Sequence, residues 1–278
     1  MSSVRAILAG MLLGALVSLA AEESVPHHGN VRPYPSRGLH MPKAEYAGSL
    51  TWLPFFEASA TAGNYWDWSA RHVDYSQGTA GNRPTWTAGG WYAFDGSDII
   101  TSTTNGFTTT TGTIMGWVNL TADGGFFPTL WSLCYGDNAT HYSFVTFRIT
   151  QATSYDVVQL IVSVDDVTKL NIHTPVNSSD AFVSAWHHMA VVQGGGTDQY
   201  LYIDGIQQTK TEITTTDRAA WWDDVRGGTY KGNLTTVGAL KFKNANTNWL
   251  NGAVDDVRVF NFALTSNQVW TVYTRGAK

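Results

Sequence analysis

Paired carboxylates are the residues of this chain with the clearest potential for chemistry, because cleavage of a glycosidic bond needs two of them, about 5 Å apart in retaining enzymes. Glutamate occurs at only five positions: 22, 23, 45, 57 and 212. No two of these have the spacing that places both side chains on one face of a strand. Aspartate occurs in adjacent pairs at 165–166, 223–224 and 255–256. Neighbours on a strand point to opposite faces, so such a pair cannot act on one substrate. Because GxSxG, HExxH, P-loop and paired CxxC motifs are also absent from the sequence, we expect a protein that is not an enzyme.

The segment at 212–233 carries the residues best suited to bind a ligand. It is a long insertion between two predicted strands, and its candidate ligand-binding residues are Trp221, Trp222, Asp223, Asp224, Arg226 and Tyr230. Aromatic rings stack on sugar faces, and loops on rigid β-scaffolds concentrate binding residues. Two adjacent tryptophans in a polar loop are not easily both buried, so we expect one to be exposed. The alternative is that these rings close an open end of the fold, and the same alternative holds for a second aromatic cluster at Tyr65, Trp66 and Trp68.

Alternating apolar residues predict the strands that must position these groups. The alternation covers 113–120, 143–149, 157–164, 186–192, 199–203, 234–240 and 253–260. In 157–164, for example, Val158, Leu160 and Val162 face one way and Gln159 and Ser163 the other. Asp204-Gly205 between two such runs predicts a hairpin. Only the stretch after Thr265 resembles a helix, since Thr265 and Gln268 fit a capping box.

Composition agrees with an all-β chain and excludes several partners. Only 14% of the 278 residues are charged, and the net charge of −5 offers no basic surface for nucleic acid or anionic membrane. Cys134 is the single cysteine, so an intrachain disulfide is impossible, and its apolar neighbours predict a buried, inert thiol.

The first 46 residues predict export followed by an extended arm. Arg5 precedes an apolar stretch with small residues near position 20, which is typical of a cleaved signal peptide over 1–21. If it is retained, the stretch is marginal for a membrane span, so no stable span is expected after cleavage. Four prolines make 22–46 an extended linker. In an assembly, this arm is a candidate for wrapping a neighbouring subunit, which leaves self-assembly as a possible partner interaction.

Four passages in order resemble the laminin G-like, concanavalin A-like jelly-roll family. They are the entry at 52–69, the strand WYAFDGSD at 91–98, the pair WHHMAVVQ and YLYIDG at 186–205, and the closing NGAVDDVRVFNFAL at 251–264. The resemblance covers roughly residues 50–275 and implies two curved antiparallel sheets, in which Trp186 would fill the core beside Val191. It also implies that an enzyme of this fold would carry an ExDxxE pair, which this chain lacks.

The expected protein is thus an all-β, two-sheet antiparallel jelly-roll β-sandwich over 47–278, with a short C-terminal helix and an N-terminal leader plus extended linker. Many family members carry one structural Ca²⁺, and the resemblance maps its ligands onto Asp95, Asp255 and Asp256. We expect a secreted or cell-surface, non-catalytic, lectin-like module that binds a glycan or a surface protein. The alternative is a structural or interaction subunit of a cell surface, an extracellular filament or a virion, acting as a decoration or adhesion protein.

Overall fold

The computed structural model describes residues 49–53, 64–65, 75–77, 81–87, 89–103, 106–121, 127–152, 155–175, 182–196 and 198–276. The expected leader and linker lie outside these residues, and so do Trp66, Trp68 and the ring of Tyr65. In the described part of the chain, no helix has both the length and the apolar character needed to cross a bilayer.

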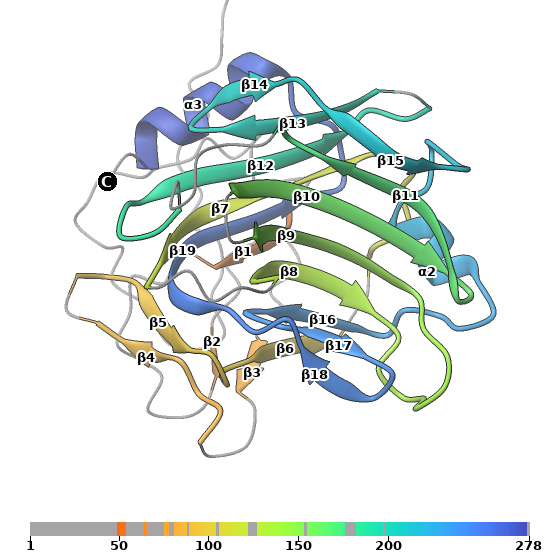
Figure 1. The fold of residues 1–278 in the computed structure, drawn as a ribbon, viewed down its shortest axis with the longest axis horizontal. Coiled ribbons are helices and arrows are strands. Elements are labelled where there is room, and N and C mark those ends of the chain that lie inside the picture. The colour runs from red at the N-terminus through yellow and green to blue at the C-terminus, as the bar shows by residue number, and fades with distance from the viewer. Residues whose placement is uncertain are drawn as a thin grey trace, which may run out of the picture. The chain divides into compact units, whose positions relative to one another are not determined.

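Two large antiparallel sheets form the body of the fold (Figure 1). The first sheet runs in the order β14 (Ile206–Gln208), β13 (Gln199–Ile203), β12 (His187–Gln193), β7 (Gly112–Leu120), β19 (Asn251–Phe260), β5 (Tyr92–Asp95) and β4 (Thr85–Trp86), with β1 (Ser49–Leu53) also paired to β19. The second runs β15 (Thr211–Thr215), β11 (Val167–His173), β10 (Tyr155–Val164), β9 (Phe144–Ala152), β8 (Thr129–Cys134), β16 (Leu234–Val237), β6 (Ile100–Thr103), β3 (Tyr75–Gln77) and β2 (Asn64–Tyr65). The predicted two-sheet sandwich is therefore confirmed.

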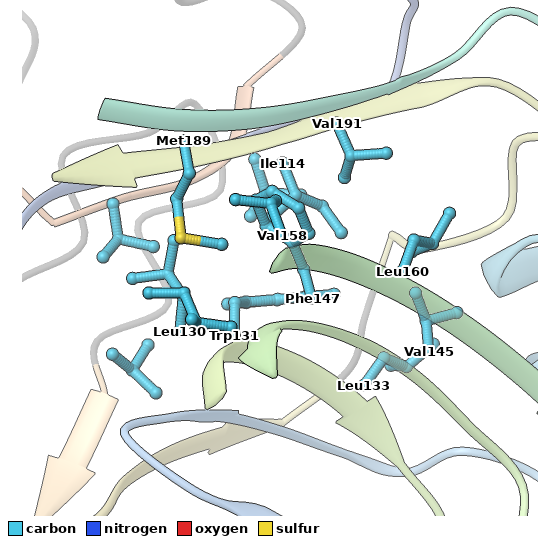
Figure 2. Packing of buried hydrophobic residues seen from close by; sticks show 14 of the residues in the cluster. Ile114, Leu130, Trp131, Leu133, Val145, Phe147, Val158, Leu160, Met189 and Val191 are labelled. Atoms are coloured by element: carbon cyan, nitrogen blue, oxygen red, sulfur yellow. The ribbon is translucent and has the colours of Figure 1, made fainter. Parts of the chain in front are cut away.

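The core lies between the inner faces of the two sheets. Figure 2 shows Ile114, Met189 and Val191 of the first sheet pointing toward the side chains of β8, β9 and β10. The labelled residues of those three strands are Leu130, Trp131, Leu133, Val145, Phe147, Val158 and Leu160, each at most 1% exposed. The alternation predicted for 157–164 is confirmed, because Val158, Leu160 and Val162 all belong to this core. Gln159 and Ser163 consequently face outward.

Each sheet also carries a cover on its outer face. Helix α3 (Ser266–Gly276) packs Val269 and Val272 against Met115, Ala190 and other residues of the first sheet. The hairpin of β17 (Leu240–Phe242) and β18 (Ala245–Thr247) packs Leu240 on Cys134, Phe144 and Ile161 of the second sheet. Burial raises the pKa of the Cys134 thiol to about 11, which confirms the predicted buried cysteine and keeps the thiol protonated.

Three local expectations differ from the structure. Trp186 precedes β12, is only half-buried and meets Trp91 edge to face at 5.5 Å, whereas Trp131 on β8 is fully buried in the core. The run at 234–240 is two strands, because Gly238 adopts a φ of +86° between β16 and β17. A second helix, α2 (Trp222–Gly227), was not expected, since six residues give no helical periodicity to detect.

The predicted hairpin at Asp204-Gly205 is confirmed. The two residues join β13 to β14 with φ values of +51° and +74°, as a two-residue turn between twisted antiparallel strands requires. Asp204 also accepts hydrogen bonds from the His188 amide and from His187 Nδ1, at 2.9 and 2.8 Å. The pKa of Asp204 is lowered, because these bonds together outweigh the effect of burial.

Replacing Gly252 by alanine is expected to destabilise the fold by at least about 3 kcal/mol. Gly252 lies in β19 with a φ of +154°, and an added Cβ would stand 2.3 Å from the Asn119 carbonyl oxygen. The obstacle is a backbone atom, so no rotation of a side chain can relieve the clash. Urea unfolding of Gly252→Ala measures the loss. Gly227→Ala is the control, since nothing lies within 4 Å of a Cβ there, and equal stability of the two variants would contradict the expectation.

Candidate binding site

Both tryptophans of the 212–233 segment are completely buried, so the expectation that one of them is exposed is wrong. Trp221 is the extended residue before α2 and Trp222 is the first helical residue, and this change of backbone turns both rings inward. Trp222 contacts Phe107 at 5.5 Å and Trp131 at 6.5 Å between ring centroids, and its indole N–H donates to Thr109 Oγ1 at 3.1 Å. These rings therefore extend the core, as the alternative interpretation proposed, and have no free face for a sugar.

The charged residues beside them hold the segment in place. The Asp224 carboxylate accepts a hydrogen bond from the Trp221 amide at 3.0 Å, and Arg226 Nη1 donates to the Gly232 carbonyl at 2.9 Å. Asp223 is half-buried, and burial together with the nearby Asp224 charge raises its pKa. A strand was the expected position of this adjacent pair, but both aspartates lie in the first turn of α2.

Tyr230 belongs to a stacked aromatic cluster at the turn between β10 and β11. Its ring lies 4.1 Å from His141 at an angle of 10°, and 5.8 Å from Tyr135 at 29°. Asp165 accepts hydrogen bonds from the amides of Thr229 and Tyr230 at 3.0 and 2.9 Å. Asp166 accepts from the Tyr142 amide at 2.8 Å and contacts His141 Nδ1 at 2.6 Å. We call Tyr135, His141, Asp165, Asp166 and Tyr230 the Tyr230 cluster.

The polar groups of the Tyr230 cluster mainly connect three loops to one another, which leaves few of them for a ligand. Asp165 and Asp166 form the hairpin turn, with φ values of +49° and +66°. The hydrogen bond to His141 lowers the pKa of Asp166, and the Tyr230 and Thr229 amides lower that of Asp165 in spite of burial. Both carboxylates are thus already engaged, and Tyr230 has His141 and Tyr135 against its ring. Of the residues predicted at 212–233, Tyr230 is the one with an aromatic ring that is not fully buried.

The three aspartates assigned to calcium by resemblance do not fit a common site. Asp95 pairs with Asn251 across β5 and β19, which leaves it roughly 13 Å along the strand from Asp255. Asp256 forms a bidentate ion pair with Arg258 at 2.6 and 2.8 Å, and Asp255 Oδ1 accepts from the Asp256 amide at 2.7 Å. Asp95 instead accepts from the Ser97 amide and hydroxyl. The described residues also contain no group of three or more His, Cys, Asp or Glu side chains placed to hold a metal. Calcium binding stays a prediction without a ligand set.

A second polar surface lies on the outer face of β9, β10 and β11. Arg148 Nε donates to Gln159 Oε1 at 2.9 Å, Thr150 Oγ1 donates to the same oxygen at 2.6 Å, and Gln159 Nε2 donates to Asn171 Oδ1 at 2.8 Å. The guanidinium carbon of Arg148 stands 4.3 Å from the centre of the Phe127 ring, which is 38% exposed. We call Phe127, Arg148, Thr150, Gln159 and Asn171 the Arg148 surface.

Strand pairing fixes the geometry of the Arg148 surface. Arg148 lies directly opposite Gln159, and Gln159 lies opposite His173 on β11. All three side chains face outward because Phe147, Val158 and Ile172 on the same strands face the core. Arginine can only donate, so Gln159 must present its oxygen to Arg148 and its NH₂ to Asn171. Gln159 thereby sets the orientation of both neighbours.

The sequence predicts that the residues of the Arg148 surface face away from the core, but not that their side chains bond to one another. The alternation over 143–149 and 157–164 assigns Arg148 and Gln159 to the side away from the core. No motif marks them, because the residues lie 11 and 12 positions apart and meet only through the pairing of three strands. An arginine amid the apolar alternation of 143–149, a run with no acidic residue, was the available signal.

The fold and the strand pairing together define a jelly-roll β-sandwich with a hydrogen-bonded polar group on the outer face of its second sheet. The profile of the Concanavalin A-like lectin/glucanases superfamily matches residues 94–270. The chain belongs to this superfamily. No curated protein matches the sequence.

Three solved structures that are similar in fold are distant in sequence from this chain. The botulinum neurotoxin serotype D binding domain shares 13% identity at a TM-score of 0.54, over 83% of this chain and 52% of that one. The leech intramolecular trans-sialidase complexed with 2,7-anhydro-Neu5Ac shares 15% at 0.50, over 62% and 24%. The Ruminococcus gnavus IT-sialidase CBM40 bound to α2,3-sialyllactose shares 15% at 0.48, over 60% and 84%. At these identities the similarity shows the fold alone.

Trp222→Ala is expected to cost about 3–5 kcal/mol of stability, because the ring is fully buried among aromatic neighbours. Thermal and urea unfolding measure the loss. Trp270→Ala is the matched control, since Trp270 on α3 is 48% exposed and its removal leaves little cavity. A Trp222→Ala protein of unchanged stability would contradict the buried role of this ring.

Proposed function

We propose that this chain is an exported, non-catalytic, lectin-like module that binds a glycan on the outer face of β9, β10 and β11. The Arg148 surface is the observation that carries this proposal. It combines an exposed aromatic ring with hydrogen-bonding side chains on three paired strands. A sugar needs both, because its apolar face stacks on a ring while its hydroxyls need donors and acceptors at fixed positions.

The rigidity of the surface supports a binding role over a merely solvated face. The backbone of all three strands is fixed by pairing on both sides and by the core beneath. The side chains are fixed in turn by the bonds through Gln159. Groups held in this way lose little conformational freedom when a ligand arrives, which favours affinity.

The absence of catalysis is supported by the glutamate census of the sequence. Glu212, the glutamate among the described residues, is held by Arg218 at 2.7 Å and Lys210 at 3.3 Å. These cations lower its pKa, so it is a poor proton donor for a leaving group. The receptor binding domain of botulinum neurotoxin D has the same fold, with which a binding role is compatible.

Replacing Phe127 by alanine is expected to weaken glycan binding about 3- to 10-fold, because one ring stack is lost. A glycan array with the full chain finds the ligand, and titration of the best hit compares the variants. Trp270→Ala serves as the control, since Trp270 is exposed on the other side of the sandwich. A wild-type chain that binds no glycan would overturn the proposal, and with large oligomers in light scattering it would support a structural subunit instead.

Export is expected to remove the first 21 residues in the native host. The basis is the run of apolar and small residues after Arg5. Mass spectrometry of the mature N-terminus from the secreted fraction is the measurement. A protein that retains Met1 would contradict cleavage, and its absence from the secreted fraction would contradict export.

A further inference from the structure

The Arg148 guanidinium has only part of its hydrogen-bonding capacity in use. Its Nε donates to Gln159, and one face of its plane lies on the Phe127 ring. A guanidinium carries five N–H donors, so the four on Nη1 and Nη2 remain. Among the residues that the structure describes, no carboxylate pairs with Arg148, and no acceptor contacts either Nη atom. The outer edge of the fork is therefore open.

The other polar groups of the surface leave donors open as well. Gln159 Oε1 already accepts from Arg148 and Thr150, and Asn171 Oδ1 accepts from Gln159. Within the described chain, the Asn171 NH₂ has no acceptor. A ligand that meets this surface thus finds N–H donors and a positive charge, while the amide oxygens are occupied. Such a surface favours a ligand rich in acceptors and negative in charge.

Desolvation makes the charge of Arg148 more effective toward a ligand. Partial burial lowers the pKa of the guanidinium to about 10, so the group is still positive at neutral pH. Among the residues that the structure describes, no opposite charge contributes to this shift. Charges shielded from water interact more strongly with a partner than solvated ones do. An incoming anion would supply the missing counter-charge.

The other charged groups of this face do not oppose an anionic ligand. Lys169 lies two residues from Asn171 on β11 and adds a positive charge, which is one of the causes that lower the pKa of Asp165. Glu212 on β15 is occupied by Lys210 and Arg218. Arg148 is the cation of the hydrogen-bonded group that the structure describes on this face. A planar carboxylate matches its fork with two parallel hydrogen bonds.

We propose that the Arg148 surface binds the carboxylate of an acidic sugar, with the open fork of Arg148 on the carboxylate, the Asn171 NH₂ on a neighbouring oxygen and the sugar ring beside Phe127. The proposal rests on the proposed glycan-binding function and names its ligand class. Sialic acids and uronic acids share this chemistry, so the experiment includes both.

The test is a titration of the full chain with five probes and lactose as the neutral reference. The probes are 3′-sialyllactose, tri-galacturonic acid, the carboxyl-reduced form of each, and lactose 3′-sulfate as the sulfate counterpart. One of the two carboxylated probes is expected to bind, and its reduced form on the order of 10- to 100-fold more weakly, because charge-assisted hydrogen bonds are lost. Which one binds identifies the source of the carboxylate. The wild-type comparison needs no variant, so it holds even where a substitution impairs folding.

Arg148→Ala is expected to weaken binding of the carboxylated probe on the order of 10- to 100-fold, and Arg148→Lys by less, since lysine keeps the charge but not the fork. Arg83→Ala is the matched control, because it removes the same charge from an exposed loop before β4 of the other sheet. Thermal unfolding of each variant confirms that the fold is retained.

The outcomes separate this inference from the function on which it rests. Equal binding of carboxylated and reduced probes, or carboxylate binding unchanged in Arg148→Ala, would overturn the inference and leave glycan binding intact. Equal affinity for the sulfated probe would overturn the choice of carboxylate. Binding of no glycan, neutral or acidic, would overturn the proposed function itself.

Discussion

The burial of one face of β8, β9 and β10 against β7 and β12 is the constraint on which the rest of this structure depends. Each strand has two faces, and one of them is buried in the core, as the fully buried Trp131, Phe147 and Val158 show. The opposite face of the same strands thereby faces solvent or the β17–β18 hairpin. Register matters as much as periodicity, because a slip of one residue would exchange the two faces. The pairing of Arg148 with Gln159 is one consequence of that register.

Aromatic residues close the sandwich where the strands end. Trp221 and Trp222 enter the core through the short α2, and the Tyr230 cluster fastens the following loop to the β10–β11 turn. Trp221, Trp222 and Tyr230 all belong to the 212–233 segment, which therefore closes the core with its tryptophans and holds the β10–β11 turn near Tyr230. A polar loop rich in tryptophan is thus not by itself a binding loop. The ring of Trp222 lies inside the fold because it packs against Phe107 and Trp131.

The sequence predicted the fold well and the site only in part, for a physical reason. Strand periodicity and turn residues are local, so Val158 and Leu160, the Asp204-Gly205 turn and the helix after Thr265 could all be assigned from neighbours in the chain. The environment of Trp222 depends on Phe107, which lies more than a hundred positions away, and no local pattern encodes it. The Arg148 surface is of the same kind, since three strands must pair before its members meet. The calcium assignment stays a prediction for a different reason, because resemblance carries over residue types without the distances between them. The Asp255–Asp256 pair lies at a bulge where Arg258 pairs with one carboxylate.

The position of Gln159 has an evolutionary consequence. Its backbone belongs to the core strand β10, while its side chain sets the orientation of Arg148 on one neighbouring strand and of Asn171 on the other. A substitution at this one position would therefore change which hydrogen-bonding atoms the outer face presents, while the core residues that pack the two sheets together stay the same. Stability and, in the proposed function, ligand preference therefore depend on opposite faces of the same strands. A lineage with this fold is free to change its preference one outward residue at a time while the inward ones stay as they are.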